Sequence, residues 1–277
     1  VRVILAVPGG AAVALAHDLV RGVTLTGSAA AGAQVAALAG TVLKKCVMEL
    51  GGSDPYLILE DADLDHAAKL CAQARCGNAG QTCIAAKRFI AIESVREPFE
   101  QKLLNEMREW APGDPLHPDT KLGPLARPEG RVALQKQVDK SVQSGAKLLL
   151  GGAPIPGPGN YYPPTLLAGV TPGMAVFDEE TFGPVAAVIS ARDEAEAIAL
   201  ANRHSYGLGA GVFTRDLARG RRIAQTELEA GACVVNDFVK SDPRLPFGGV
   251  KQSGYGRELG LFGPREFVNI KSVVVRD

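Results

Sequence analysis

Short apolar runs alternate along the chain with longer segments in which apolar residues recur at helical spacing. The short runs predict buried strands and the periodic segments predict helices, an alternation typical of an α/β protein. We therefore expect an α/β fold. The predicted strands are Gly22–Thr26, Val47–Leu50, Tyr56–Leu59, Phe89–Ile92, Val185–Ile189, Gly209–Phe213 and Ala232–Val235. The predicted helices are Ala29–Ala39, Leu64–Arg75, Val95–Trp110, Pro128–Ser144, Glu194–Asn202 and Asp216–Leu228.

Four further segments complete this pattern. The apolar stretch Val3–Val7 has the composition of a domain interior, and Phe267–Val275 alternates apolar residues as a terminal extended segment would. Pro154–Pro164 is rich in proline and glycine, so we expect a surface loop there. The acidic stretch Asp61–Asp63 is expected to cap the helix that follows it.

Composition and charge narrow the class of protein. A chain of 277 residues with 46% hydrophobic and 22% charged residues is long enough for one large or two modest domains with a sizeable core. Its 30 basic and 30 acidic residues cancel, which gives no electrostatic reason to expect nucleic acid or a membrane surface as a partner. No apolar run reaches the roughly 20 residues that span a bilayer.

The five cysteines are few, odd in number and irregularly spaced. This usage argues against a disulfide framework and for reduced thiols, so we expect a cytoplasmic location. Cys71 and Cys76 lie five positions apart with no histidine near either, and we interpret them as small core residues. Since histidines and carboxylates do not cluster in the sequence, we expect no metal site.

Cys83 is the first residue with candidate chemistry. It follows the polar loop Gly77–Thr82, between a predicted helix and a predicted strand, and loops at such junctions often present reactive side chains. A cysteine thiolate is a strong nucleophile toward carbonyl carbon if its pKa is lowered or a base lies nearby. The alternative that the sequence leaves open is an inert, buried thiol.

Two glutamates also have a functional and a structural interpretation. Glu49 ends an apolar strand just before two glycines, and the carboxyl ends of strands are where α/β sites form. Burial there would raise its pKa and suit it to act as a general base, whereas a solvated or salt-bridged glutamate is the structural alternative. Glu180, with Phe182 nearby, could accept hydrogen bonds from a ribose diol or belong to an exposed acidic turn.

Several motifs, taken in order, resemble the aldehyde dehydrogenase family. They are Leu25-Thr26-Gly27-Ser28 with Gly32, Met48-Glu49-Leu50-Gly51-Gly52, Gly80-Gln81-Thr82-Cys83, Glu180-Thr181-Phe182-Gly183-Pro184, and Pro246–Gly254 followed by Gly256-Arg257-Glu258. The resemblance runs over essentially the whole chain, and chance agreement of so many motifs in register is negligible.

The resemblance implies a mechanism for the oxidation of an aldehyde to a carboxylic acid. Cys83 would attack the aldehyde, and its backbone N–H would donate to the oxyanion. Loss of hydride to NAD or NADP would leave a thioester, which water activated by Glu49 would hydrolyse. CoA-acylating relatives lack a base at the position of Glu49, so its presence favours release of the free acid.

The resemblance also implies where the cofactor and substrate bind. Glu180 would hold the nicotinamide ribose and Phe182 would line that pocket, with Gly27 and Ser28 near the pyrophosphate at a helix N-terminus. Segments at Ser53–Pro55, Gly159–Thr165 and Ser241–Phe247 look most like the succinate-semialdehyde dehydrogenase branch. Succinate semialdehyde is therefore the first expectation for the substrate, and other short aldehydes are the alternative. The candidate substrate-binding residues are Phe247, Arg244 and Ser241.

Arg75 is a further candidate for the substrate carboxylate, because many enzymes of that branch carry an arginine where this chain has Gly77. Arg75, Arg244 and Ser241 each have a structural alternative, which is a plain surface residue.

Family members are considerably longer at the N-terminus, so we expect an N-terminal part to be missing. Residues 1–51 are then a partial Rossmann-like dinucleotide-binding domain, residues 52–250 the catalytic domain, and residues 251–277 a return segment and oligomerisation strand. We expect the full-length enzyme to be a homo-oligomer. The family's oxyanion asparagine and adenosine-ribose lysine have no counterpart before Val23, so we expect the chain alone to oxidise aldehydes feebly or not at all.

Two other functions remain open on the sequence. Cys83 and Glu49 could serve a thiol esterase that needs no cofactor, since the family's chemistry includes thioester hydrolysis. Alternatively, the chain could be a remnant without catalytic activity.

Overall fold

The computed structural model describes residues 8–277, so the apolar stretch Val3–Val7 lies outside the described residues. The chain divides into two compact units. The larger unit is Gly52–Lys240, and the smaller unit combines the residues up to Gly51 with Ser241–Asp277. Among residues 8–277, no helix is both long and apolar enough to cross a membrane.

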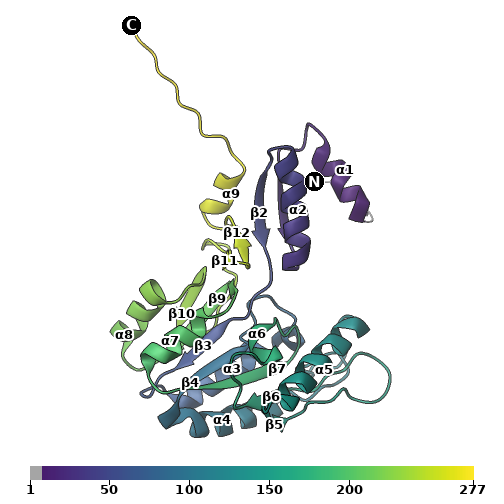
Figure 1. Ribbon diagram of the computed structural model, residues 1–277, viewed down its shortest axis with the longest axis vertical. Coiled ribbons are helices and arrows are strands. Elements are labelled where there is room, and N and C mark those ends of the chain that lie inside the picture. The colour runs from purple at the N-terminus through teal and green to yellow at the C-terminus, as the bar shows by residue number, and fades with distance from the viewer. Residues whose placement is uncertain (1–7) are drawn as a thin grey trace. The chain divides into compact units, whose positions relative to one another are not determined.

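The larger unit is built on a seven-stranded sheet with the strand order β10-β9-β3-β4-β7-β6-β5 (Figure 1). Neighbouring strands are parallel except β5 and β6, which are antiparallel. The strands of this unit are β3 (Pro55–Ile58), β4 (Arg88–Ile92), β5 (Lys147–Leu150), β6 (Thr165–Ala168), β7 (Val185–Ala191), β8 (Tyr206–Gly207), β9 (Gly209–Phe213) and β10 (Ala232–Val235). Every residue of β3, β4 and β9 is buried, as expected for central parallel strands covered on both faces.

The helices of the larger unit connect these strands in the way that parallel pairing requires. They are α3 (Leu64–Cys76), α4 (Glu93–Arg108), α5 (Pro128–Gln143), α6 (Ala175–Asp178), α7 (Glu194–Asn202) and α8 (Leu217–Arg222), with a 3₁₀ turn at Gly77–Gly80 and a π turn at Ile223–Glu227. Asp63 caps α3, because its carboxylate accepts a hydrogen bond from the His66 N–H at 3.1 Å, so the predicted cap is confirmed.

The smaller unit contains a three-stranded sheet in which β1 (Gly22–Thr26) pairs parallel with β2 (Lys45–Glu49) and β12 (Gly254–Tyr255) pairs antiparallel with β2. Gly254 has a φ of +111°, and a Cβ there would lie 1.9 Å from Met48 O, so only glycine fits this pairing. The remaining elements are α1 (Pro8–Ala16), α2 (Ala29–Thr41), β11 (Val250–Lys251) and α9 (Phe262–Glu266).

Every helix predicted from the sequence corresponds to a helix of the structure, and every predicted strand before the C-terminal segment corresponds to a strand. The structure also contains elements that the apolar pattern of the sequence did not predict. The additional elements are α1, β5, β6, β8, α6, β11, β12 and α9. After Glu266 the described chain forms neither helix nor strand, and Ile270 is 99% exposed. The oligomerisation strand expected there stays a prediction.

Candidate active site

The loop before Cys83 is strained. Three consecutive residues have left-handed backbone conformations, with φ values of 52° at Asn78, 53° at Ala79 and 71° at Gly80. Such conformations cost free energy for residues other than glycine and concentrate at functional sites. Reciprocal side-chain bonds hold the turn, since Asn78 Nδ2 donates to Gln81 O and Gln81 Nε2 donates to Asn78 O, both at 3.1 Å. Cys83 follows this turn with a half-buried side chain.

Arg75 holds the same loop from inside the protein. Its side chain is fully buried, and it donates from Nη2 to Gly80 O at 2.7 Å and from Nη1 to Thr181 O at 3.4 Å. Burial lowers the pKa of the guanidinium to about 10, so it is charged at neutral pH. The interpretation of Arg75 as a surface residue is therefore wrong, and these backbone carbonyls take the donors that a substrate carboxylate would need. Through these hydrogen bonds, Arg75 links Gly80 in the loop before Cys83 to Thr181, which follows Glu180.

Replacing Gly80 with alanine is expected to lower the free energy of unfolding by about 3 kcal/mol. A Cβ at this positive φ would lie 2.4 Å from Gly183 O and 2.5 Å from Arg75 Nη2. Denaturation in urea, followed by the fluorescence of the single tryptophan, Trp110, measures the change. The control Gly130→Ala, at an exposed position of α5 with open space around it, should stabilise by about 0.5 kcal/mol or have no effect. Equal stability of Gly80→Ala and the unaltered chain would contradict the prediction.

Lys87 is a residue that the sequence reasoning missed. It is buried, and its ammonium donates to Cys83 O at 2.9 Å and to Ala85 O at 3.0 Å. Nζ also lies 4.0 Å from Glu180 Oε1. Burial, followed by the charge of Arg75, lowers the pKa of Lys87 to about 8. The signal in the sequence was the pair of charged residues, Lys87 and Arg88, directly before the predicted strand Phe89–Ile92.

Glu180 and Phe182 face a groove of about 350 Å³. Glu180 is partly exposed, and its Oε1 accepts a hydrogen bond from the Gly52 N–H at 2.9 Å. Phe182 is 47% exposed, which is unusual for so large an apolar side chain. Gln81, two residues before the cysteine, lines the same groove. A carboxylate and an open aromatic face therefore lie beside the nucleophile loop, as ribose and nicotinamide binding would require.

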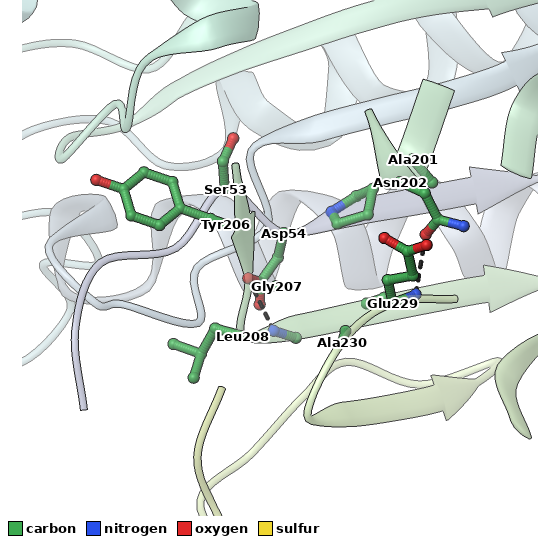
Figure 2. Close-up of a pocket in the computed structure, with 12 residues that line it drawn as sticks. Ser53, Asp54, Ala201, Asn202, Tyr206, Gly207, Leu208, Glu229 and Ala230 are labelled. Atoms are coloured by element: carbon green, nitrogen blue, oxygen red, sulfur yellow. Dashed lines mark hydrogen bonds between the residues drawn. The ribbon is translucent and has the colours of Figure 1, made fainter. Parts of the chain in front are cut away.

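A buried carboxylate lies behind this site. Asp54 lines a small cavity of about 10 Å³, large enough for roughly one water molecule (Figure 2). Its Oδ1 accepts a hydrogen bond from the Gly209 N–H at 3.0 Å, while Oδ2 and Ser53 Oγ have no hydrogen-bond partner among the described residues. Burial raises the pKa of Asp54 to about 6, and the positive charge of Lys87 opposes that rise. Asp54 therefore carries a counter-charge for Lys87 at neutral pH.

The smaller unit contains the other predicted catalytic and cofactor-binding residues. Glu49 is the last residue of β2 and is buried, with 3% of its surface exposed. Its carbonyl accepts a hydrogen bond from the Gly27 N–H at 3.0 Å, which brings Gly27 next to it. Ser28 caps α2, because its Oγ accepts a hydrogen bond from the Ala31 N–H at 3.2 Å. The strand end and the helix N-terminus expected from the sequence are thus present.

The three candidate substrate-binding residues have different surroundings. Phe247 is buried and exchanges two backbone hydrogen bonds with Glu258. Arg244 is exposed, and its Nη2 lies 2.6 Å from Asp242 Oδ2. Ser241 is exposed and begins this segment. Arg244 therefore already has Asp242 as an ion-pair partner, whereas Ser241 is open to solvent.

Residues 2–273 match the sequence model described as the aldehyde dehydrogenase family. The chain belongs to the aldehyde dehydrogenase family. This membership confirms the resemblance that the ordered motifs indicated. The roles of Cys83, Glu49 and Glu180 stay proposals, because the match concerns the family and not single residues.

Two of the curated relatives that the chain resembles are named as succinate-semialdehyde dehydrogenases. The chain is 50% identical over 251 residues to the succinate semialdehyde dehydrogenase (NAD(P)+) Sad of Escherichia coli strain K12, a match that covers 91% of the chain and 54% of that protein. It is 48% identical over 259 residues to the succinate-semialdehyde dehydrogenase (NADP(+)) of Deinococcus radiodurans, covering 94% of the chain and 54% of that protein. The chain thus spans about half the length of the curated relatives it matches.

Solved structures support the fold. The chain is similar, with a TM-score of 0.95 and 37% identity, to succinic semialdehyde dehydrogenase from Streptococcus pyogenes in complex with NADP+ as the cofactor. That match covers 98% of the chain and 60% of the other protein. A structure of NAD-dependent aldehyde dehydrogenase from Sinorhizobium meliloti matches with a TM-score of 0.91 and 38% identity, over 94% of the chain and 52% of the other protein. The expected aldehyde dehydrogenase-like α/β fold is confirmed.

Proposed function

We propose that the chain carries the catalytic centre of an NAD(P)-dependent aldehyde dehydrogenase that forms a thioester on Cys83 and releases a carboxylic acid. The observation that supports this most strongly is the nucleophile loop. Cys83 follows a strained turn that buried Arg75 holds, its own carbonyl accepts a hydrogen bond from buried Lys87, and the loop lies beside a groove lined by Glu180 and Phe182. Family membership makes aldehyde oxidation the chemistry that best fits this arrangement.

In the proposed reaction, the thiolate of Cys83 adds to the aldehyde carbon and gives a thiohemiacetal. The Cys83 backbone N–H donates to the oxyanion in this step. Loss of hydride from that carbon leaves the thioester. A water molecule that has given its proton to Glu49 then attacks the thioester carbon, which frees the acid and the thiolate. Burial of Glu49 at a strand end supports its assignment as this base.

The residues present fit a nicotinamide cofactor. The Glu180 carboxylate can accept hydrogen bonds from a ribose diol, and Phe182 offers an exposed aromatic face in the same groove. Gly27 and Ser28 precede α2, whose N-terminus favours a pyrophosphate charge. NAD(P)+ would supply the hydride acceptor at this site.

We propose succinate semialdehyde as the substrate, because the relatives named above carry that substrate in their names. The exposed ion pair between Arg244 and Asp242 contributes little free energy in water, so a substrate carboxylate can replace Asp242 at modest cost. Phe247 and Ser241 belong to the same segment and would line the approach.

Aldehyde-dependent reduction of NAD+ and NADP+ by a full-length enzyme that contains this chain, followed at 340 nm, tests the proposal, because the chain alone is expected to oxidise aldehydes feebly or not at all. Succinate semialdehyde should be preferred over butanal by up to about fivefold in kcat/KM, because a carboxylate paired with an exposed arginine contributes about 0.2–1 kcal/mol. Equal rates for both aldehydes would contradict the substrate assignment. Hydrolysis of p-nitrophenyl acetate that needs Cys83, without any NAD(P)H formation, would favour a thiol esterase instead.

The proposal extends to compartment and assembly. The low, odd cysteine count supports a reducing, cytoplasmic setting. Exposed apolar side chains at Ile270, Val273 and Val275 support pairing of the C-terminal segment with another copy of the enzyme.

A further inference from the structure

Lys87 is a buried cation that the mechanism above does not use. Its side chain is 0% exposed, although a lysine loses much hydration when it is buried. Two of its hydrogen bonds go to the carbonyls of Cys83 and Ala85, at 2.9 and 3.0 Å. A residue needed only to fill this space would not require a charge.

The charge of Lys87 lies close to the nucleophile. Because Nζ is 2.9 Å from Cys83 O, covalent geometry keeps Sγ of the same residue within about 8 Å of the ammonium. Because Lys87 is buried and Cys83 is half-buried, solvent screens their interaction less than it would screen two exposed charges. A cation at this range favours the charged form of a thiol.

We propose that Lys87 is a positioning residue whose buried ammonium fixes the backbone of the nucleophile loop and stabilises the thiolate of Cys83. The assignment of Cys83 as nucleophile rests on the function proposed above. Lys87 itself does not touch the aldehyde or the cofactor. It acts through Cys83, and Glu180 Oε1 at 4.0 Å supplies a counter-charge.

The charges that surround Lys87 are consistent with this role. Asp54, Glu180 and the Cys83 thiolate raise the pKa of Lys87, whereas burial and Arg75 lower it, with a result of about 8. Lys87 is therefore mostly charged below pH 8 and mostly neutral above it. Because the interaction is mutual, the thiolate gains most from Lys87 at neutral pH and loses that support as the pH rises through 8.

Alkylation of Cys83 by iodoacetamide as a function of pH tests the proposal. The rate is measured by mass spectrometry of the peptide that contains Cys83, between about pH 5 and about pH 10, because only the thiolate reacts. In the unaltered chain the midpoint should lie about one unit or more below the ordinary value of about 8.5. Lys87→Met should raise the midpoint by about one unit. Lys87→Arg, which keeps the charge, should keep the midpoint low.

Lys102→Met is the matched control, because Lys102 is an exposed lysine of α4 paired with Asp65, and it should leave the midpoint unchanged. A folded Lys87→Met with the midpoint of the unaltered chain would overturn the proposal. If Lys87→Met does not fold, the midpoints of the unaltered chain and of Lys87→Arg test the proposal. A midpoint at or above about 8.5 in the unaltered chain, or a raised midpoint in folded Lys87→Arg, overturns the proposal.

The alkylation experiment needs neither aldehyde nor cofactor. Expected midpoints without any NAD(P)H formation by a full-length enzyme that contains this chain would therefore refute the proposed function and leave the role of Lys87 intact. Aldehyde oxidation that depends on Cys83, together with unshifted midpoints, would refute the role of Lys87 alone.

Discussion

In a full-length enzyme that contains this chain, replacing Cys83 with alanine is expected to reduce aldehyde-dependent formation of NAD(P)H by about 10⁴-fold or more. Alanine leaves the fold and the groove at Glu180 and Phe182 unchanged but removes the atom on which both the thiohemiacetal and the thioester form. Loss of a nucleophile typically leaves only the contribution of binding and of the oxyanion donors. Absorbance at 340 nm with saturating aldehyde and cofactor measures the loss.

Cys233→Ala is the control for this prediction. Cys233 lies in β10, and burial raises the pKa of its thiol to about 11, so it is a poor nucleophile at neutral pH. Its replacement should leave the rate within about twofold, as expected for a substitution outside the site. If Cys83→Ala kept more than a small fraction of the rate, the oxidation would not pass through a thioester on this residue.

The framework of the larger unit could be predicted because its central strands are buried on both faces. Such strands are short, nearly continuous apolar runs, and β3, β4 and β9 are of this kind. The edge strand β5 and its neighbour β6 were missed, because four-residue strands beside glycine and proline resemble loops in the sequence. The helix α1 was missed for a related reason, since its small residues give no amphipathic pattern.

The residues of the candidate site also fall into two groups, those that the sequence could predict and those that it could not. Cys83, Glu49 and Glu180 could be singled out because they belong to local motifs. Arg75, Lys87 and Arg88 could not be placed, because charged residues are almost never fully buried and the sequence favours a surface position.

Burial of the two arginines depends on carbonyls that lie far away in the sequence, whereas Lys87 donates to the nearby carbonyls of Cys83 and Ala85. Arg75 donates to Thr181 O, and Arg88 donates to Leu200 O and Ala201 O. These carbonyls are brought within reach only by the tertiary fold, since more than 100 positions separate each pair. No local pattern contains this information. The places of the buried arginines are therefore the feature for which a structure was required.

Glu49→Gln is expected to slow hydrolysis of the thioester without slowing its formation. Glutamine keeps the size of the side chain but cannot take a proton from water, so hydrolysis of the thioester should slow by about 10²- to 10⁴-fold. Attack by Cys83 and loss of hydride do not require this base. Rapid mixing of the full-length variant with aldehyde and NAD(P)+ should therefore show a burst of about one NAD(P)H per Cys83, followed by a slow steady state.

Glu97→Gln, an exposed glutamate on α4, is the matched control and should show the steady state of the unaltered chain. The size of the burst distinguishes two roles for Glu49. If the burst disappears together with the steady state, Glu49 is needed before the thioester forms, and its role as the base for water is wrong. If the burst remains while turnover slows, buried Glu49 at the end of β2 acts on the thioester and not on the thiol.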